Sequence, residues 1–182
     1  MHSFAATLIT GAIAFVATNV DDIVILTLFF SRTRQRWPII AGQYLGFSVL
    51  IALSLAGFFG GLILPHHWVR LLGLVPVAVG IKKLFVTRDD HVGWNRVGVF
   101  EVALVTFTSG ADNIGIYAPL FAVSDSAQLI ELLMVFYLLL GMWCVLGYVI
   151  PRHQTVANVL RRCGHWIGPF VLIGLGVYIL SN

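Results

Sequence analysis

Long apolar stretches separated by short polar segments run through the whole chain. Six of them reach the roughly 20 residues that a membrane-spanning helix needs, and they cover residues 3–30, 39–64, 67–86, 98–123, 127–149 and 164–181. None shows the alternation of polar and apolar positions that marks the strands of a membrane barrel. The pattern therefore predicts an all-α integral membrane protein with six transmembrane helices.

The composition agrees with this prediction. Hydrophobic residues make up 59% of the 182 positions and charged residues 10%, whereas an ordinary globular domain has about 25% charged residues. A soluble domain of this length would need a polar shell that the chain does not have. We therefore expect a single transmembrane domain over residues 1–182, surrounded by membrane lipid.

The basic residues predict how the spans are oriented. If the first, third and fifth loops are cytoplasmic, only Arg70 of the 11 basic residues lies outside, in line with the positive-inside rule. The cytoplasmic set is then Arg32, Arg34, Arg36, Lys82, Lys83, Arg88, Arg96, Arg152, Arg161 and Arg162. This assignment predicts a multi-pass protein of the plasma membrane with both termini outside the cytoplasm. No basic face interleaved with aromatic residues suggests a nucleic-acid partner.

An internal repeat relates the two halves of the chain. Residues 18–30 align without a gap with residues 109–121, at an offset of 91 that places Asp21 on Asp112. Aspartates deep in apolar segments are costly, so their recurrence at the same place in both halves requires an explanation.

Weaker matches support a repeat over the whole chain. Tyr44 and its neighbours resemble the segment at Tyr137, so we divide the chain into repeat one, about 1–86, and repeat two, about 98–182, joined by the polar segment 87–96. Each repeat holds three predicted spans, an odd number, so the second repeat must enter the membrane from the opposite side. Inverted repeats of this kind point to a transporter with a binding site near the midplane.

The first and fourth spans are predicted to be interrupted near that midplane. The first span has 28 residues, which would extend about 42 Å as a helix against a hydrocarbon core of about 30 Å. The excess would allow the helix to unwind at Thr18, Asn19 and Val20. Ser109 and Gly110 would allow the same in the fourth span.

The buried aspartates predict a cation site. Each mid-bilayer Asp costs roughly 2.5–3.5 kcal/mol on insertion scales, and no Lys or Arg lies in the central turns of any predicted span. A bound cation would supply the missing charge, and oxygen ligands suit divalent metal ions. The candidate metal ligands are Asp21, Asp22, Asp112, Asn113, Asn19, Thr18 and Ser109. The candidate pathway residues are Gln43, Tyr44, Tyr117 and Tyr137.

At these residues the chain resembles the cadmium-resistance transporter (CadD) family of the LysE superfamily of small exporters. The resemblance rests on four motifs in order: ATNVDDI at 17–23, GQYLGF at 42–47, GADNIGIY at 110–117 and PFVLIGLG at 169–176. It implies an exporter that removes cadmium (Cd²⁺) or a related divalent cation from the cell. The cation would be the substrate, and we expect no cofactor.

The sequence also limits the source of energy. The chain has no Gly-x-x-x-x-Gly-Lys-Ser/Thr loop, so ATP is not expected to be its direct source. Three carboxylates around an ion of charge +2 leave one negative charge, which a proton can neutralise. We therefore predict secondary-active export by proton antiport, with protons as the coupling ion. A homodimer is a candidate assembly for so small a transporter.

Three other interpretations stay open. The aspartates could form a structural polar cluster that joins the helices. The chain could export organic cations or amino acids, with aromatic residues such as Phe29, Phe30, Tyr117 or Trp143 enclosing a quaternary ammonium. Two intramembrane aspartates could also activate water in a hydrolase, although the inverted repeat disfavours an enzyme.

Other candidate ligands lie away from the aspartates. Glu101 and Glu131 fall within a turn or two of the ends of their spans, so we expect them at the membrane interface. His66 and His67 form a pair in an outer loop, which we expect to be solvated. A lone buried cysteine usually packs as a small hydrophobic side chain, and we expect this role for Cys144.

Overall fold

The computed structural model describes residues 4–63 and 97–150, together with residues 71–72, 74–75, 77–78, 81, 170 and 173–180; the side chains of Asp21 and of residues 61–63 are not among those described. The helices with defined bounds are α1 (Phe4–Arg32), α2 (Trp37–Ile63), α5 (Val99–Ser109), α6 (Ala111–Ala122) and α7 (Ser126–Val149). Within the described residues all regular structure is helical, which confirms the all-α prediction.

The helices follow the predicted spans closely. α1, α2 and α7 match the first, second and fifth spans to within two residues at each end, and α5 with α6 covers the fourth. Of the described helices, α7 and the segment Trp37–Gly60 of α2 are long and apolar enough to cross a membrane, and α1 is a third if its two bent halves form one span. The third and sixth spans and the repeat boundary at 87–96 lie largely outside the described residues, so the count of six stays a prediction.

Local sequence explains where two of these helices begin. At the start of α7 the Asp125 side chain accepts a hydrogen bond from the Gln128 backbone N–H at 2.8 Å, and the Gln128 side chain accepts one from the Asp125 N–H at 2.9 Å. This capping box satisfies N–H groups that have no partner within the helix. α2 has Pro38 in its first turn, where the missing proline N–H breaks no helical hydrogen bond.

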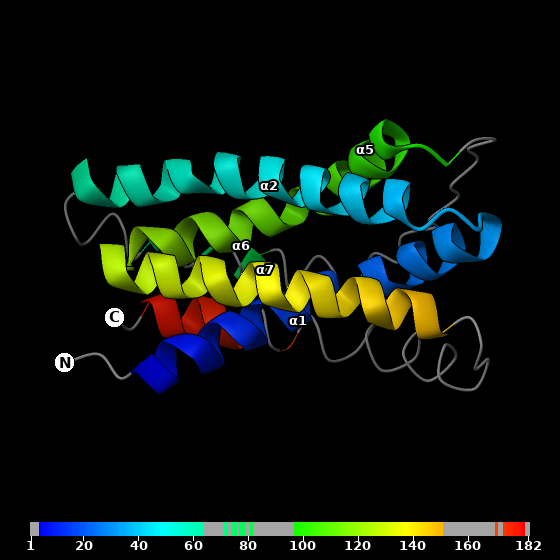
Figure 1. The fold of residues 1–182 in the computed structure, drawn as a ribbon. Helices are drawn as coiled ribbons and strands as arrows, with labels where there is room; N and C mark the ends of the chain where they lie inside the picture. Colours follow the sequence, from blue (N-terminus) through cyan, green and yellow to red (C-terminus); the bar gives the residue numbers. More distant parts are fainter. Residues whose placement is uncertain are drawn as a thin grey trace.

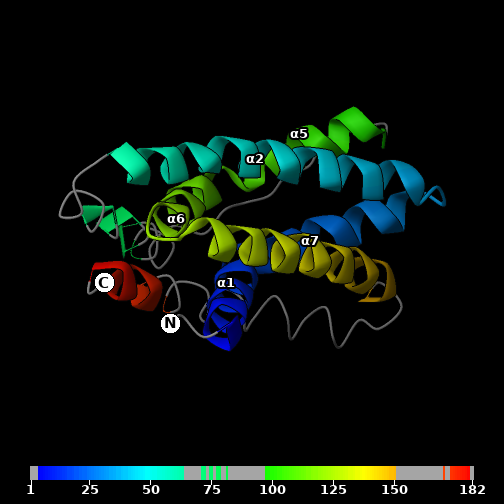
Figure 2. The same ribbon diagram turned by 60° about the vertical axis from the view of Figure 1, so that its left-hand side comes forward.

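The helices pack in two sets that run in opposite directions. α1 packs along α7, while α2 packs along both α5 and α6. Figure 1 shows α1 and α7 running one way and α2 and the α5–α6 pair running the other way; the same pairs are seen side by side in the turned view of Figure 2. In the sequence repeat, α1 corresponds to α5–α6 and α2 corresponds to α7. The packing of α1 against α7 is therefore equivalent, in the sequence repeat, to the packing of α5–α6 against α2.

Positions that the repeat matches make matching contacts. The offset is 91 residues between α1 and α5–α6, as from Asp21 to Asp112, and 93 residues between α2 and α7, as from Tyr44 to Tyr137. With these offsets, the matched contacts are Gly11 against Val135 and Val102 against Gly42, then Asn19 against Trp143 and Gly110 against Leu50. The matched residues Tyr44 and Tyr137 contact each other.

Glycine allows α2 to approach its partners closely. A Cβ atom at Gly46 would lie 2.5 Å from the Ala103 carbonyl oxygen of α5, and one at Gly57 would overlap the backbone of Ala118 in α6. Such distances are too short for any side chain. Small residues at helix contacts are typical of membrane proteins, where van der Waals packing drives helix association.

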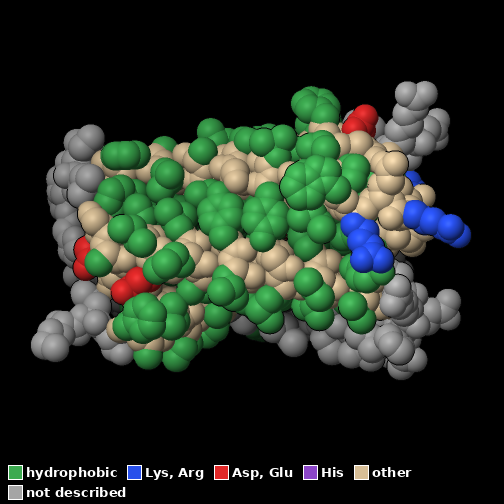
Figure 3. Space-filling model, viewed as in Figure 1, with side chains coloured by type: hydrophobic (Ala, Val, Ile, Leu, Met, Phe, Trp, Pro, Cys, Tyr) green, Lys and Arg blue, Asp and Glu red, His purple; other side chains and the backbone are tan. Residues whose placement is uncertain are grey.

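The outer surface of α2 and α7 is apolar along most of its length. Hydrophobic side chains cover this face in Figure 3, and the Lys and Arg side chains seen there gather at one end. The exposed apolar residues on the two helices include Leu45, Val49, Leu53, Leu138, Met142 and Val145. A surface of this kind is suited to lipid, as expected for a membrane protein.

The basic end of the bundle is formed by the α1–α2 connection. Arg32, Arg34 and Arg36 are exposed there, and we call this end the arginine end. The Arg36 guanidinium lies 4.2 Å from the centre of the Tyr148 ring, a cation–π contact. It joins the connection to the last turn of α7.

Candidate functional site

The predicted interruption of the fourth span is present as a break, whereas residues 18–20 of the first span stay helical and a bend follows them. The axis of α1 bends by 58° between Phe4–Val20 and Asp22–Arg32, next to the predicted break at residues 18–20. α5 ends at Ser109 and α6 begins at Ala111, with Gly110 between them at φ −87° and ψ 4°. In the alignment of the two sequence repeats, the bend in α1 and the break at Gly110 between α5 and α6 therefore fall at nearly equivalent positions.

The bend in α1 is held by a side chain of α7. The indole Nε1 of Trp143 donates a hydrogen bond to the backbone carbonyl of Asn19 at 2.7 Å, and both residues are buried. A helix that breaks inside a membrane needs partners for its freed backbone groups from neighbouring helices. Trp143 supplies one such partner, and nothing in its local sequence signals this bond.

The Tyr117 hydroxyl joins α6 to the same bend. It lies 2.7 Å from Thr18 Oγ1, and it accepts a hydrogen bond from Asn19 Nδ2, also at 2.7 Å. Thr18 Oγ1 donates to the carbonyls of its own helix at Ala14 and Phe15, so the Tyr117 hydroxyl is the donor towards Thr18. Tyr117, predicted as a pathway residue, is fully buried here and links the two repeats.

The Asp22 carboxylate links the two broken helices directly. The Ser109 hydroxyl donates to Asp22 Oδ1 at 3.0 Å. Only 4% of Asp22 is exposed, so this carboxylate is removed from bulk solvent. Two of the predicted ligands, 87 residues apart in sequence, therefore meet at the place where the two helix breaks face each other.

Asn113 lies one turn beyond Ser109 and is 1% exposed. Neither its Nδ2 nor its Oδ1 atom has a hydrogen-bond partner among the described residues, and the same holds for Asn19 Oδ1. Each buried polar group without a partner costs about 1–3 kcal/mol. A ligand that reached these amide atoms would recover this free energy.

The structure assembles part of the predicted ligand set. Asp22, Ser109, Thr18 and Asn19 lie around the α1 bend through the bonds given above, and Asp112 is half-buried in the first turn of α6. The side chain of Asp21 lies outside the description. Among the side chains that are described, no group of three or more His, Cys, Asp and Glu residues could hold a metal ion. The described side-chain oxygen atoms around the α1 bend belong mainly to hydroxyl and amide groups.

The other candidate pathway residues lie between α2 and its neighbours. Gln43 is buried, and its Oε1 accepts a hydrogen bond from Thr106 Oγ1 at 2.7 Å. Tyr44 and Tyr137 stack with ring centroids 6.2 Å apart, and the Tyr137 hydroxyl bonds Ser48 Oγ at 2.9 Å. Thr106 was not predicted from the sequence, although it lies three residues before Ser109, on the same face of the helix.

Three of the remaining candidates lie in described parts of α5 and α7. Glu101 is in the first turn of α5, and Glu131 is in the second turn of α7; both are half-buried. Cys144 is buried with a free thiol, as expected from the sequence. His66 and His67 lie outside the described residues.

Broken helices joined by buried polar side chains are typical of membrane transporters. Comparison with protein families is consistent with this class: the family model described as cadmium resistance transporter matches residues 15–182. The chain therefore belongs to the cadmium resistance transporter family, and the resemblance found in the sequence is confirmed. Comparisons with curated proteins and with solved structures found no match.

Proposed function

We propose that this protein is a secondary-active exporter of divalent heavy-metal cations, cadmium in the first place, and that it binds the cation between the two helix breaks. The proposed ligands are those predicted from the sequence: Asp21, Asp22, Asp112, Asn113, Asn19, Thr18 and Ser109. Membership of a transporter family supports the class of activity. The position of the site and the coupling to protons are parts of the proposal.

One observation carries the proposed site. The buried Asp22 carboxylate accepts a hydrogen bond from Ser109, which joins α1 at its bend to the end of α5. Asn113 occupies the position of Asp22 in the other repeat, and its buried amide group has no hydrogen-bond partner among the described residues. A carboxylate at this depth is costly unless it is neutralised. A divalent cation would neutralise it and would also accept the Asn113 carbonyl oxygen as a ligand.

The inverted repeat is part of the same proposal. It is supported by the opposite directions of the matched helices in Figure 1 and by the contact between the matched residues Tyr44 and Tyr137. A residue contacts its own match only when both lie next to the axis that relates the repeats. We therefore place a pseudo-twofold axis between α2 and α7, with the two breaks on opposite sides of it.

The proposed direction of transport follows from charge. The arginine end would face the cytoplasm under the positive-inside rule, so cadmium would enter from that end and leave at the opposite end. Protons would travel the other way and neutralise the carboxylates of the empty site.

Substitution of the aspartates tests this function. Asp21→Asn, Asp22→Asn and Asp112→Asn should each abolish the cadmium tolerance that the protein confers on sensitive cells, because each removes a charge that the cation needs. Glu131→Gln is the matched control, since it makes the same chemical change in α7, away from the helix breaks, and it should leave tolerance within about twofold of the wild type. Full tolerance in Asp22→Asn at equal membrane abundance would reject the site.

A further inference from the structure

The two sides of the proposed site are lined by different chemistry at matched positions. The repeat alignment sets Phe15 on Thr106 and Phe136 on Gln43. Phe15 and Phe136 contact each other with ring centroids 5.9 Å apart, and Thr106 is hydrogen bonded to Gln43 at 2.7 Å. The repeats therefore make the same contact twice, once between aromatic rings and once between polar groups.

The polar pair lies between the site and the arginine end. α2 and α5 both start at that end (Figure 1), and Gln43 and Thr106 lie about 9–10 Å along them, whereas Ser109 lies about 15 Å along α5. The Ser109 hydroxyl also approaches the Thr106 carbonyl at 3.2 Å. Polar groups thus continue from Gln43 through Thr106 to the Asp22–Ser109 bond. Gln43 Nε2 has no partner in the described part of the chain although only 2% of the residue is exposed.

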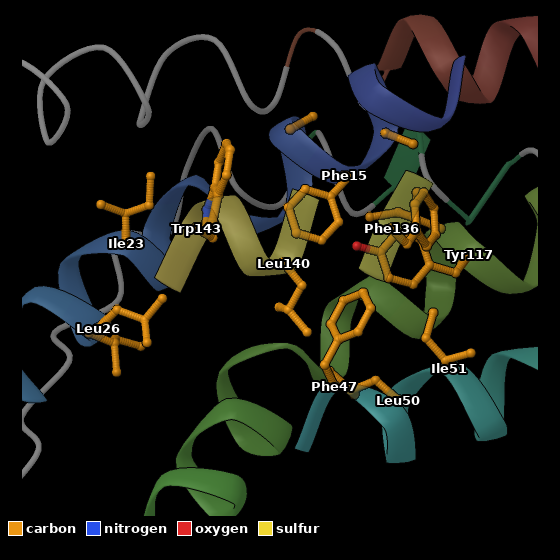
Figure 4. Packing of buried hydrophobic residues seen from close by; sticks show 14 of the residues in the cluster. Phe15, Ile23, Leu26, Phe47, Leu50, Ile51, Tyr117, Phe136, Leu140 and Trp143 are labelled. Atoms are coloured by element: carbon orange, nitrogen blue, oxygen red, sulfur yellow. The ribbon is translucent and has the colours of Figure 1, made fainter. Parts of the chain in front are cut away.

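The aromatic pair belongs to a cluster on the other side of the site. Figure 4 shows Phe15, Phe47, Tyr117 and Phe136, from four different helices, turned towards one another. The Tyr117 and Phe136 ring centroids are 4.7 Å apart, and those of Phe47 and Tyr117 are 6.1 Å apart. All four side chains are fully buried. A closed cluster of apolar side chains offers no polar partner to a hydrated ion.

Both pairs are buried, so the difference lies in what each side offers to a cation. A cation that loses water on its way to the carboxylates needs oxygen atoms as replacements, and the Gln43–Thr106 pair offers an amide and a hydroxyl oxygen, whereas the phenylalanines offer none. We propose that Gln43 and Thr106 form an access-side subsite for the divalent cation, and that the matched Phe15–Phe136 contact is the seal that opens for release. This inference rests on the proposed function.

Substitution at Gln43 tests the subsite. A proton gradient across proteoliposomes drives cadmium transport, and the cadmium concentration that gives half-maximal transport is measured. Gln43→Leu should raise this concentration about tenfold, because one lost polar contact is worth about 1.4 kcal/mol. Gln43→Glu retains the oxygen and should not raise it. Gln35→Leu makes the same change in an exposed glutamine at the arginine end and should behave as the wild type. An unchanged half-maximal concentration in Gln43→Leu would overturn the subsite.

Substitution at Phe136 tests the seal. Phe136→Gln copies the residue at the matched position and should raise passive cadmium leakage about tenfold or more in liposomes without a gradient, because it opens the apolar constriction to water. Phe136→Leu stays apolar and should leak much less. Equal, wild-type leakage in both variants, with monodisperse protein, would overturn the seal, and the Gln43 measurement decides the subsite even if Phe136→Gln does not fold.

Equilibrium binding separates this inference from the proposed function. Wild-type protein in detergent should bind cadmium, and Asp22→Asn should not. If these binding results are obtained and the Gln43 and Phe136 variants transport and leak as the wild type does, the proposed subsite and seal are rejected and the proposed exporter function is retained. If the wild type binds no divalent cation, the exporter itself is rejected, and the subsite is rejected with it.

Discussion

Tyr44 and Tyr137 occupy the same position in the two sequence repeats and stack on each other, with ring planes inclined by 23°. The contacts around them are also matched. Ser48 lies 2.9 Å from the Tyr137 hydroxyl, and its match Gly141 lies against the Tyr44 hydroxyl, where an added Cβ would be 2.9 Å away. The two hydroxyl groups therefore contact matched positions of the repeats, and Gly141 leaves the space that the Tyr44 hydroxyl occupies.

This relationship predicts a suppressor pair. Gly141→Ala should destabilise the protein by about 1–3 kcal/mol, because the methyl group overlaps the Tyr44 hydroxyl. Tyr44→Phe removes that hydroxyl together with its 3.3 Å hydrogen bond to the Tyr137 carbonyl, so it should restore part of the lost stability when combined with Gly141→Ala. Thermal unfolding of the three variants in detergent measures this coupling. Strictly additive effects would show that the two groups do not compete for the same space.

The Trp143 hydrogen bond gives a second prediction. Trp143→Phe keeps a buried ring but removes the donor to the Asn19 carbonyl, so the unfolding free energy should fall by about 1–3 kcal/mol, and cadmium binding should weaken because the bend positions Asp22. Trp37→Phe is the control, since Trp37 is 73% exposed and should change stability by less than about 0.5 kcal/mol. Equal stability of the two variants would mean that the indole does not hold the bend.

The sequence predicted the positions of the helices better than their partners. The length of the first span and the polar run at Thr18 and Asn19 predicted an interruption close to the observed bend, because both are local properties, but residues 18–20 stay helical. The bond between Asp22 and Ser109 was not predictable in this way, since it depends on how helices 87 residues apart pack. The repeat did carry this information in part, because it set Asp22 on Asn113 before any contact was known.

The same limit applies to individual side chains in the site. Tyr117 was predicted to line a path, yet its hydroxyl is engaged by Thr18 and Asn19 in the structure. A tyrosine can pack, bond or line a path, and sequence alone does not distinguish these roles. Trp143 and Thr106 acquire their roles only from the helices packed against them.

The ten-to-one distribution of basic residues predicts the topology. Both termini should face away from the cytoplasm, because the predicted first, third and fifth loops carry all basic residues except Arg70. A reporter fused after Asn182 that matures only outside the cytoplasm should be active, and one that works only in the cytoplasm should be silent. The opposite pattern would reverse the orientation of the protein, and with it the direction assigned to export.

The last prediction concerns coupling to protons. Asp21, Asp22 and Asp112 would carry a charge of −3 around an ion of charge +2, so neutrality requires a proton in the loaded site and further protons in the empty one. Binding of cadmium to detergent-solubilised protein should therefore release protons, and its apparent affinity should fall as the pH is lowered, because protons and the cation compete for the same carboxylates. In proteoliposomes a proton gradient should drive cadmium uphill, against the direction of proton flow. Asp22→Asn should release no protons on addition of cadmium, which provides the control for nonspecific binding. Cadmium movement that stays downhill at every proton gradient, with no protons released by the wild type, would identify a channel in place of an antiporter.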